Sequence, residues 1–252
     1  MRKELREDST LTRTHDTRRL ILSYLEYVRD LGEDEILFDE SISLDSVRGA
    51  SDTSREYGTS LDDIADAIRS CRSCPLHSSR RNAVPGDGNT KSGFVFVGEA
   101  PGGTEDREGK PFVGASGQLL RRLLQIAGIG ESCFFIMNII KCRPPGNRDP
   151  LTEEIEACRP FTEQQLKVLK PKLIVALGRF AGRYLLKRGE DSIRMMRGTL
   201  HSVEGIPVIV TYHPSALLHQ ENFRSHAWED IVFIRHTADS LGLLTSNGSQ
   251  KT

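Results

Sequence analysis

The chain alternates between short continuous runs of apolar residues and stretches in which apolar residues recur every three or four positions. The continuous runs predict buried strands over residues 94–97, 134–140, 173–177 and 208–211. The periodic stretches predict helices that begin after Ser60, near 116, at Thr152, after Gly178 and near 225. We expect Ser60 and Thr152 to cap the helices that begin there. Strand and helix alternate, as in a parallel sheet with helices on both faces. We therefore expect an α/β fold with three layers, α/β/α, around a central, mainly parallel four-stranded sheet.

The two ends of the chain have a different pattern. Apolar residues between 11 and 32 recur at helical spacing, which predicts an N-terminal helical extension that docks on the domain or binds a protein partner. Residues 39–59 are rich in Ser, Asp, Glu and Arg, which is typical of a linker. We therefore divide the chain into an N-terminal helix and polar linker over 1–59, a folded domain over 60–244 and a frayed tail over 245–252.

Composition and charge restrict the class of protein. Of 252 residues, 37% are hydrophobic and 27% are charged, which is typical of a globular protein. No apolar run approaches the ~18 residues of a membrane helix. The charged N-terminus lacks the apolar core of a secretory signal. A formal net charge of -1 argues against general adhesion to nucleic acid but allows a local basic face. We expect a cytoplasmic monomer without a membrane segment.

Polar side chains stand where three of the predicted strands end. Glu99 follows the first strand, Asn138 lies in the second and His213 follows the fourth. In a parallel sheet these strand ends share one edge, where open α/β sheets bind ligands. Phe112 lies between two glycine clusters, on a loop rather than in a core. The glycines alone fit a tight strand-to-helix connection as well as they fit a binding site. Glu99 and Phe112 in the same loop favour a binding site.

Four of the five cysteines are candidate metal ligands. Cys71 and Cys74 form a CxxC pair, whereas Cys142 and Cys158 stand far along the chain. Zinc ribbons usually bring two close pairs, so this spacing fits the four-cysteine ligation of an iron–sulfur cluster better. A zinc site and four unrelated cysteines are the alternatives. Cys133 precedes two phenylalanines, and we expect it to be a buried apolar side chain.

Three motifs, in this order, resemble those of the family 4 uracil-DNA glycosylases, the iron–sulfur type. The first is Gly98-Glu-Ala-Pro-Gly102, continued by Gly109-Lys-Pro-Phe-Val-Gly114. The second is Asn138-Ile-Ile-Lys-Cys-Arg-Pro-Pro-Gly-Asn-Arg148, and the third is His213-Pro-Ser-Ala-Leu-Leu218. The resemblance covers about residues 71–223. Any one motif would be weak evidence, but several in the right order are specific.

The resemblance implies a fold, an activity and a cofactor. It implies a uracil-DNA glycosylase-like domain whose partner is uracil-containing DNA, single- or double-stranded, in the cytoplasm and at the nucleoid. The implied activity in base excision repair flips uracil out of DNA, hydrolyses its N-glycosidic bond and leaves an abasic site. The implied ligands of a [4Fe-4S] cluster are Cys71, Cys74, Cys142 and Cys158.

The sequence also departs from its relatives. Gly103-Thr104 replaces charged residues that the family often carries, and we expect this to alter DNA contacts rather than chemistry. A related enzyme of the superfamily bonds covalently to deoxyribose through a histidine in a basic insertion. This chain passes directly from Arg148 to Asp149 without an insertion, so we expect turnover rather than self-trapping.

The resemblance and the chemistry of excision suggest roles for the motif residues. Phe112 stacks on the flipped base. The Asn138 amide accepts from uracil N3–H and donates to O4, a pattern that cytosine reverses. His213 donates to uracil O2, which gains negative charge as the bond breaks. Glu99 positions water or favours the cationic sugar. Without the motifs, we would interpret Asn138 as a strand-end cap, His213 as an ordinary loop histidine and Glu99 as an exposed acid.

The remaining candidates shape the pocket or contact DNA. The Ala100 backbone amide contacts the base, and Glu105 either excludes the methyl group of thymine or only holds the loop. Leu217 or Leu218 fills the gap left in the base stack, as apolar wedges do. The candidate phosphate contacts are Lys110, Ser116, Arg143, Arg148 and Ser215. The alternatives are a non-catalytic iron–sulfur module that binds DNA and senses damage, and a zinc-stabilised nucleotide-binding protein.

Overall fold

A computed structural model describes residues 58–244. The predicted helix within residues 11–32, most of the predicted linker and the tail from 245 lie outside this range. None of the helices within it combines the length and the apolar character that crossing a membrane requires.

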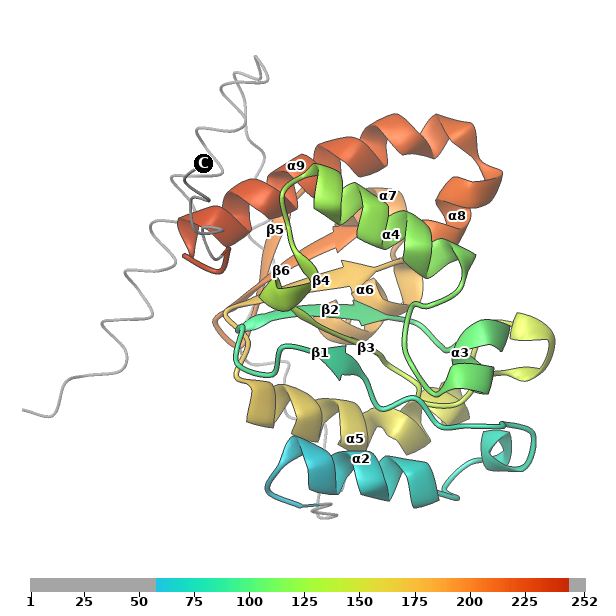
Figure 1. Cartoon of the computed structure of the whole chain (residues 1–252). Helices are drawn as coiled ribbons and strands as arrows, with labels where there is room; N and C mark the ends of the chain where they lie inside the picture. Colours follow the sequence, from blue (N-terminus) through green and yellow to red (C-terminus); the bar gives the residue numbers. More distant parts are fainter. Residues whose placement is uncertain (1–57, 245–252) are drawn as a thin grey trace, which may run out of the picture.

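A six-stranded sheet forms the middle layer of the domain (Figure 1). Its strands are β1 (Asp87–Gly88), β2 (Phe94–Gly98), β3 (Phe135–Asn138), β4 (Leu173–Leu177), β5 (Leu200–Val203) and β6 (Ile206–Thr211). Their order across the sheet is β1-β3-β2-β4-β6-β5. β3, β2, β4 and β6 run parallel to one another, while β1 and β5 pair antiparallel at the two edges. The mainly parallel sheet is therefore confirmed.

The prediction of four strands matches the parallel core and misses both edge strands. β1 has only two residues, both exposed, within a glycine-rich loop. β5 is at most partly buried and carries His201 and Ser202. An edge strand takes its hydrogen bonds from a single neighbour and is only partly covered, so it needs no continuous apolar run. Its position depends on the strand beside it, which the local sequence does not reveal.

Helices cover both faces of the sheet (Figure 1). Val95 and Val97 of β2 pack in one core cluster with residues of α2 (Leu61–Ser70), α5 (Thr152–Leu169) and α6 (Arg179–Leu186). Phe94 and Phe96 pack in the other cluster with α4 (Ala115–Ile126) and α9 (Arg224–Ser240). Successive side chains of a strand point to opposite faces, so a strand covered on both must be continuously apolar. This confirms the three-layer α/β/α architecture.

Short elements complete the described chain. The short helices are α3 (Gly103–Glu108), α7 (Ile193–Met196) and α8 (Pro214–His219). The 3-10 turns are η2 (Pro75–Ser78), η3 (Glu131–Cys133), η4 (Pro145–Asn147) and η5 (Glu221–Phe223). α3, η4 and α8 follow β2, β3 and β6, so they stand at the edge of the sheet where the parallel strands end.

Side chains set the start of two long helices. Ser60 Oγ accepts from the Asp63 amide at 3.1 Å and the Asp63 carboxylate accepts from the Ser60 amide at 3.2 Å, a capping box that confirms the predicted N-cap of α2. The prediction that Thr152 caps α5 is wrong. Leu151 occupies the cap position, because its amide donates to Glu154 Oε2 at 2.9 Å. The Leu151 carbonyl accepts the first helical hydrogen bond, from the Ile155 amide at 3.1 Å, which places Thr152 inside the helix.

Candidate active site

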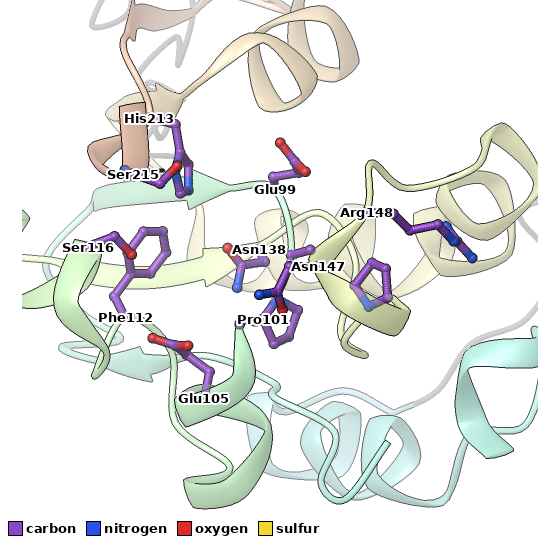
Figure 2. Close-up of a pocket in the computed structure, with 13 residues that line it drawn as sticks. Glu99, Pro101, Glu105, Phe112, Ser116, Asn138, Asn147, Arg148, His213 and Ser215 are labelled. Atoms are coloured by element: carbon purple, nitrogen blue, oxygen red, sulfur yellow. Dashed lines mark hydrogen bonds between the residues drawn. The ribbon is translucent and has the colours of Figure 1, made fainter. Parts of the chain in front are cut away.

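The ends of three parallel strands meet around one cavity, as the sequence predicted. Gly98 at the end of β2 pairs in register with Asn138 at the end of β3. Glu99 follows β2, and His213 follows β6 as the N-cap of α8. These side chains and Phe112 line a cavity of about 220 Å³ (Figure 2). The cavity is large enough for a pyrimidine base.

Most predicted site residues line this cavity, together with some that the sequence did not single out. The predicted residues in its wall are Glu99, Ala100, Glu105, Phe112, Ser116, Asn138, Arg148, His213 and Ser215. The additional wall residues are Pro101, Gly102, Pro144 and Asn147. Asn147 adopts a left-handed backbone conformation with φ 57. The preceding Pro-Pro-Gly run signals a turn, but only the fold brings that turn to the cavity.

Asn138 lines the cavity and has a side-chain acceptor without a partner among the described residues. Its side chain is 1% exposed, and Oδ1 is buried with no hydrogen-bond partner among the described residues. A buried acceptor left unsatisfied costs about 1–3 kcal/mol. A Cβ atom at Gly98 would lie 2.5 Å from Asn138 Oδ1 and 2.5 Å from Phe112 Cζ. The glycine at the end of β2 therefore allows both side chains to form the wall.

Phe112 forms the aromatic wall and has a strained backbone. Its side chain is 4% exposed and belongs to the core cluster that contains Phe94 and Phe96, so the expectation that it lies outside a core is wrong. Its ring centroid lies 6.0 Å from that of His213. Its φ of 54 lies in the left-handed region, which aromatic residues rarely adopt. A Cβ atom at Gly117 would lie 1.9 Å from the Phe112 carbonyl oxygen, so the loop packs directly on α4. Such strain persists only where the surroundings impose it, and it gathers at functional sites.

His213 is a neutral hydrogen-bond donor. Burial lowers its pKa to about 4, and the nearby Glu105 opposes this only in part. The Ser215 amide donates to Nδ1 at 3.2 Å, and the Ser215 hydroxyl lies 2.7 Å from the same atom. Because Nδ1 accepts, we assign the proton to Nε2. Nε2–H is then the donor that a ligand in the cavity can use.

Two carboxylates in the wall have different surroundings. Burial raises the pKa of Glu99 to about 7; Asp149 adds to the rise and Arg179 opposes it. Glu105 is 7% exposed, and its Oε1 accepts from the Gly114 amide at 2.8 Å. Glu105 thus holds the loop that carries Phe112 and also lines the cavity. Both interpretations offered by the sequence are compatible with this position.

The predicted phosphate contacts differ in whether their side chains already bind another group of the protein. Lys110 is exposed, whereas the half-buried Arg143 donates from Nε to Asn147 Oδ1 at 2.8 Å. Arg148 donates to both carboxylate oxygens of Glu154, at 2.9 and 2.6 Å. In Figure 2 its side chain points away from Phe112 and Asn138. Arg148 therefore braces the loop before α5 in this structure.

The two candidate wedge residues occupy different environments. Leu217 is 4% exposed and packs with Tyr212 and Ala227 in a small core cluster. Leu218, the next residue of α8, is 41% exposed. Adjacent residues of a helix point in different directions, so only one of the pair faces the core. The fold makes Leu218 the available apolar side chain.

The four candidate ligand cysteines line a second, small cavity, between α2, η2 and α5. Cys71, Cys74, Cys142 and Cys158 share this cavity with Arg80 and Lys141. All five cysteines are free thiols. Within residues 58–244 no three His, Cys, Asp or Glu side chains are arranged to hold a single metal ion.

Two of these sulfurs accept hydrogen bonds, and burial raises the pKa of one of them. Arg80 Nη1 donates to Cys142 Sγ at 3.0 Å, and the Lys141 amide donates to Cys158 Sγ at 3.3 Å. Burial raises the pKa of Cys158 to about 12. Cys133 is 5% exposed and packs with the core cluster on the opposite face of the sheet, which confirms that it is a buried apolar side chain.

Comparison with known proteins identifies the family. A profile described as "Uracil DNA glycosylase superfamily" matches residues 85–232. The chain is 43% identical over 195 residues to a protein from Saccharolobus solfataricus named Type-4 uracil-DNA glycosylase, which covers 74% of this chain and 90% of that protein. A protein of the same name from Sulfurisphaera tokodaii is 45% identical, over 71% of this chain and 85% of that protein. Another from Thermotoga maritima is 42% identical, over 67% of this chain and 89% of that protein. The chain belongs to the uracil DNA glycosylase superfamily.

Proposed function

We propose that the chain is a uracil-DNA glycosylase of DNA repair, which releases free uracil and leaves an abasic site. The observation that carries this proposal is the Asn138 side-chain amide in the wall of a pyrimidine-sized cavity, with an Oδ1 that is buried and has no partner among the described residues. Uracil offers N3–H to this acceptor and O4 to the amide nitrogen. Cytosine presents the opposite pattern, which leaves buried polar groups unsatisfied. The names of the relatives support the same substrate.

We infer that residues of the cavity wall assist cleavage of the N-glycosidic bond between uracil and deoxyribose. The N1–C1′ electrons move onto the uracil ring, so negative charge develops at O2 and positive charge on the sugar. Nε2–H of His213 donates to O2; a donor of this kind changes rates by about 10²–10³ at other oxyanion sites. Water then bonds to C1′, and its proton passes to the solvent. Glu99 orients that water as a carboxylate and stabilises the cationic sugar.

The base reaches the cavity only after it leaves the stack. Phe112 then stacks on the flipped ring, a contact worth about 1–3 kcal/mol in other complexes. Leu218 is the side chain proposed to fill the gap in the duplex, because Leu217 is buried in the core. Lys110, Ser116, Arg143 and Ser215 are proposed to contact phosphates, and Arg148 supports the loop beside them.

We also propose that Cys71, Cys74, Cys142 and Cys158 hold an iron–sulfur cluster. The support for this proposal is that the four thiols line one cavity, and four cysteines are the usual ligands of such a cluster. When bound, the cluster supplies a covalent brace between the start of the domain, the segment after β3 and α5. An iron assay and the visible absorbance of the purified protein test this proposal. A monomeric and cytoplasmic state stays a prediction.

The first experiment measures free uracil released from a uracil-containing oligonucleotide. Wild type should release uracil, and an oligonucleotide with cytosine at the same position should yield no base. Asn138→Ala should lower kcat/KM for uracil by at least about tenfold, because it removes hydrogen bonds that are each worth about 1–3 kcal/mol in buried sites. His213→Ala should lower kcat by about 10²-fold.

A matched variant and a binding assay make this test decisive. Asn222→Ala changes an exposed asparagine outside the cavity and should leave release unchanged. If wild type with intact visible absorbance binds the oligonucleotide but releases no uracil, the chain is a DNA-binding module and not an enzyme.

A further inference from the structure

Lys141 is a buried cation between the two sites. Its side chain is 1% exposed, although lysine is almost never fully buried without a paired charge. It stands three residues after Asn138 and directly before Cys142, and it lines the cavity of the four cysteines. A buried ammonium carries a penalty of several kcal/mol unless opposite charge compensates it. Lys141 therefore needs a source of negative charge close to its ammonium.

No carboxylate within residues 58–244 pairs with this ammonium. Nζ donates to the main-chain oxygen of Asn138 at 2.6 Å and lies 3.8 Å from Met137 Sδ. Both acceptors are neutral. The groups beside Lys141 that can become anionic are Cys142, the next residue, and Cys158, whose Sγ accepts from the Lys141 amide at 3.3 Å; all three line one cavity. Thiols carry that charge permanently only when they are bound to metal, because a coordinating thiol is deprotonated.

Lys141 also fixes the main chain at Asn138, whose side-chain amide is proposed to recognise uracil. The Lys141 amide donates to Cys158 Sγ at 3.3 Å, while its ammonium reaches back to the Asn138 carbonyl. Its own carbonyl accepts from the Val84 amide at 2.8 Å. The turn from Asn138 to Cys142 is therefore held at Lys141 by contacts with both the cysteine site and the end of β3.

We propose that Lys141 is a positioning residue that links the two sites: its ammonium is the counter-ion of the metal-bound thiolates and fixes the Asn138 carbonyl. Metal bound to the four cysteines would then hold the Lys141 ammonium in place. The ammonium in turn holds Asn138, which is proposed to recognise uracil. The part of this inference that concerns uracil rests on the proposed function. The part that concerns the thiolates does not.

The test compares Lys141→Met and Lys141→Gln with wild type, each as the full chain purified with its metal. Met has a similar length but neither charge nor donor, whereas Gln keeps a donor and loses the charge. Lys167→Met, an exposed lysine on α5, is the matched control. Three quantities are measured: iron retained during incubation with a chelator, the midpoint potential of the visible chromophore, and KM and kcat for uracil release with the ratio of uracil to cytosine release.

Both variants should lose iron faster than the control and shift the midpoint potential to more negative values, because a positive charge beside the metal favours the reduced state. Lys141→Met should also lower kcat/KM for uracil by about tenfold to a hundredfold, since it removes a charged hydrogen bond of about 1.5–3 kcal/mol. Lys141→Gln should retain more of this activity than Lys141→Met. If Lys141→Met does not fold, iron retention and potential of Lys141→Gln decide the case.

Wild-type iron retention and potential in both variants would overturn the proposal. Loss of iron with unchanged kcat/KM would overturn the link to Asn138 and leave Lys141 as a counter-ion only. If wild type itself releases no uracil, the proposed function fails, while iron retention and potential still test the role of Lys141 at the thiolates.

Discussion

At the scale of single residues, the cavity depends on Gly98, where an added methyl group would meet two of its walls. Its carbon would lie 2.5 Å from both Asn138 Oδ1 and Phe112 Cζ, closer than non-bonded atoms approach. The absence of a side chain thus brings an amide and an aromatic ring together at the end of β2. The sequence marks this glycine as part of a turn, but the close approach involves residues from three different segments.

Glu99 predicts how excision depends on pH. Burial raises its pKa to about 7, so the carboxylate becomes protonated as the pH falls below this value. If the carboxylate orients water, kcat/KM should fall about tenfold per pH unit below about 7. His213, with its pKa lowered to about 4, stays neutral through this range and should not contribute.

Initial rates of uracil release across a pH series measure this dependence, with Glu99→Gln as the comparison. The variant should be slower than wild type above pH about 7 and should lack the decline below it. A wild-type profile that stays flat across neutral pH, or a variant that keeps the decline, would contradict the role given to Glu99.

At the scale of elements, a buried carboxylate of α9 holds the end of β6 beside the cavity. Asp230 is 1% exposed. It accepts from Thr211 Oγ1 at 2.7 Å and from Arg197 at 3.0 and 2.8 Å. The Arg197 guanidinium also lies 5.3 Å from the centre of the Tyr212 ring. Because Thr211 and Tyr212 precede His213, this network positions the strand end from which the histidine projects.

Asp230→Ala should destabilise the protein by about 3–5 kcal/mol, because it leaves the mostly buried Arg197 without its main partner. It should also lower kcat for uracil release, since the end of β6 loses its anchor. Urea denaturation measures the free energy of unfolding, and the glycosylase assay measures kcat.

Asp239→Ala on the same helix is the control, because this aspartate is exposed. Its effect should stay within about 0.5 kcal/mol. Equal stability of the two variants would show that the Asp230 network does not anchor β6.

At the scale of the whole molecule, affinity for DNA has to come from local cations. The net charge of -1 gives no general attraction to phosphates, so a few residues near the cavity have to supply it. Arg143 is a proposed residue of this kind. Its guanidinium lies 3.3 Å from the position that a Cβ atom at Gly103 would take. Gly103 therefore leaves room for Arg143 beside α3.

Uracil release should weaken as salt rises, with a slope set by the number of phosphate contacts. Lys110→Ala and Arg143→Ala should each reduce the slope of log kcat/KM against log salt by about 1. The assay is run below KM on single- and double-stranded oligonucleotides. Lys91→Ala, in the loop before β2 at the opposite edge of the sheet, should leave the slope unchanged. Identical slopes for all variants would remove Lys110 and Arg143 from the DNA interface.

Much of the fold and of the candidate site could be predicted because each feature has a local signal. The continuous apolar run from Phe94 to Val97 indicates a strand covered on both faces, and the spacing of Leu120 and Leu124 indicates a helix with one buried side. Parallel strands end at one edge, so Glu99, Asn138 and His213 could be assigned to one site from chain order alone. These predictions needed only short-range patterns and the rule that parallel strands end at one edge of their sheet.

Other features depend on neighbours that are distant in sequence. The edge strands β1 and β5 exist because β3 and β6 offer them hydrogen bonds. Arg148 pairs with Glu154 rather than standing free for a phosphate, and Leu217 rather than Leu218 faces the core. No spacing rule distinguishes these alternatives, because each is decided by which atoms fill the space around the side chain.

By itself, the sequence determined the order of the four parallel strands and of the long helices between them, the motif residues at the strand ends and the cysteine spacing. The tertiary structure alone decided that Asn138 Oδ1 would lack a partner, that Gly98 would admit Phe112 beside it, and that Lys141 would be buried between the cavity and the cysteines. The physical reason is that periodicity follows from backbone geometry within a segment. Burial and hydrogen-bond satisfaction arise only when separate segments pack together.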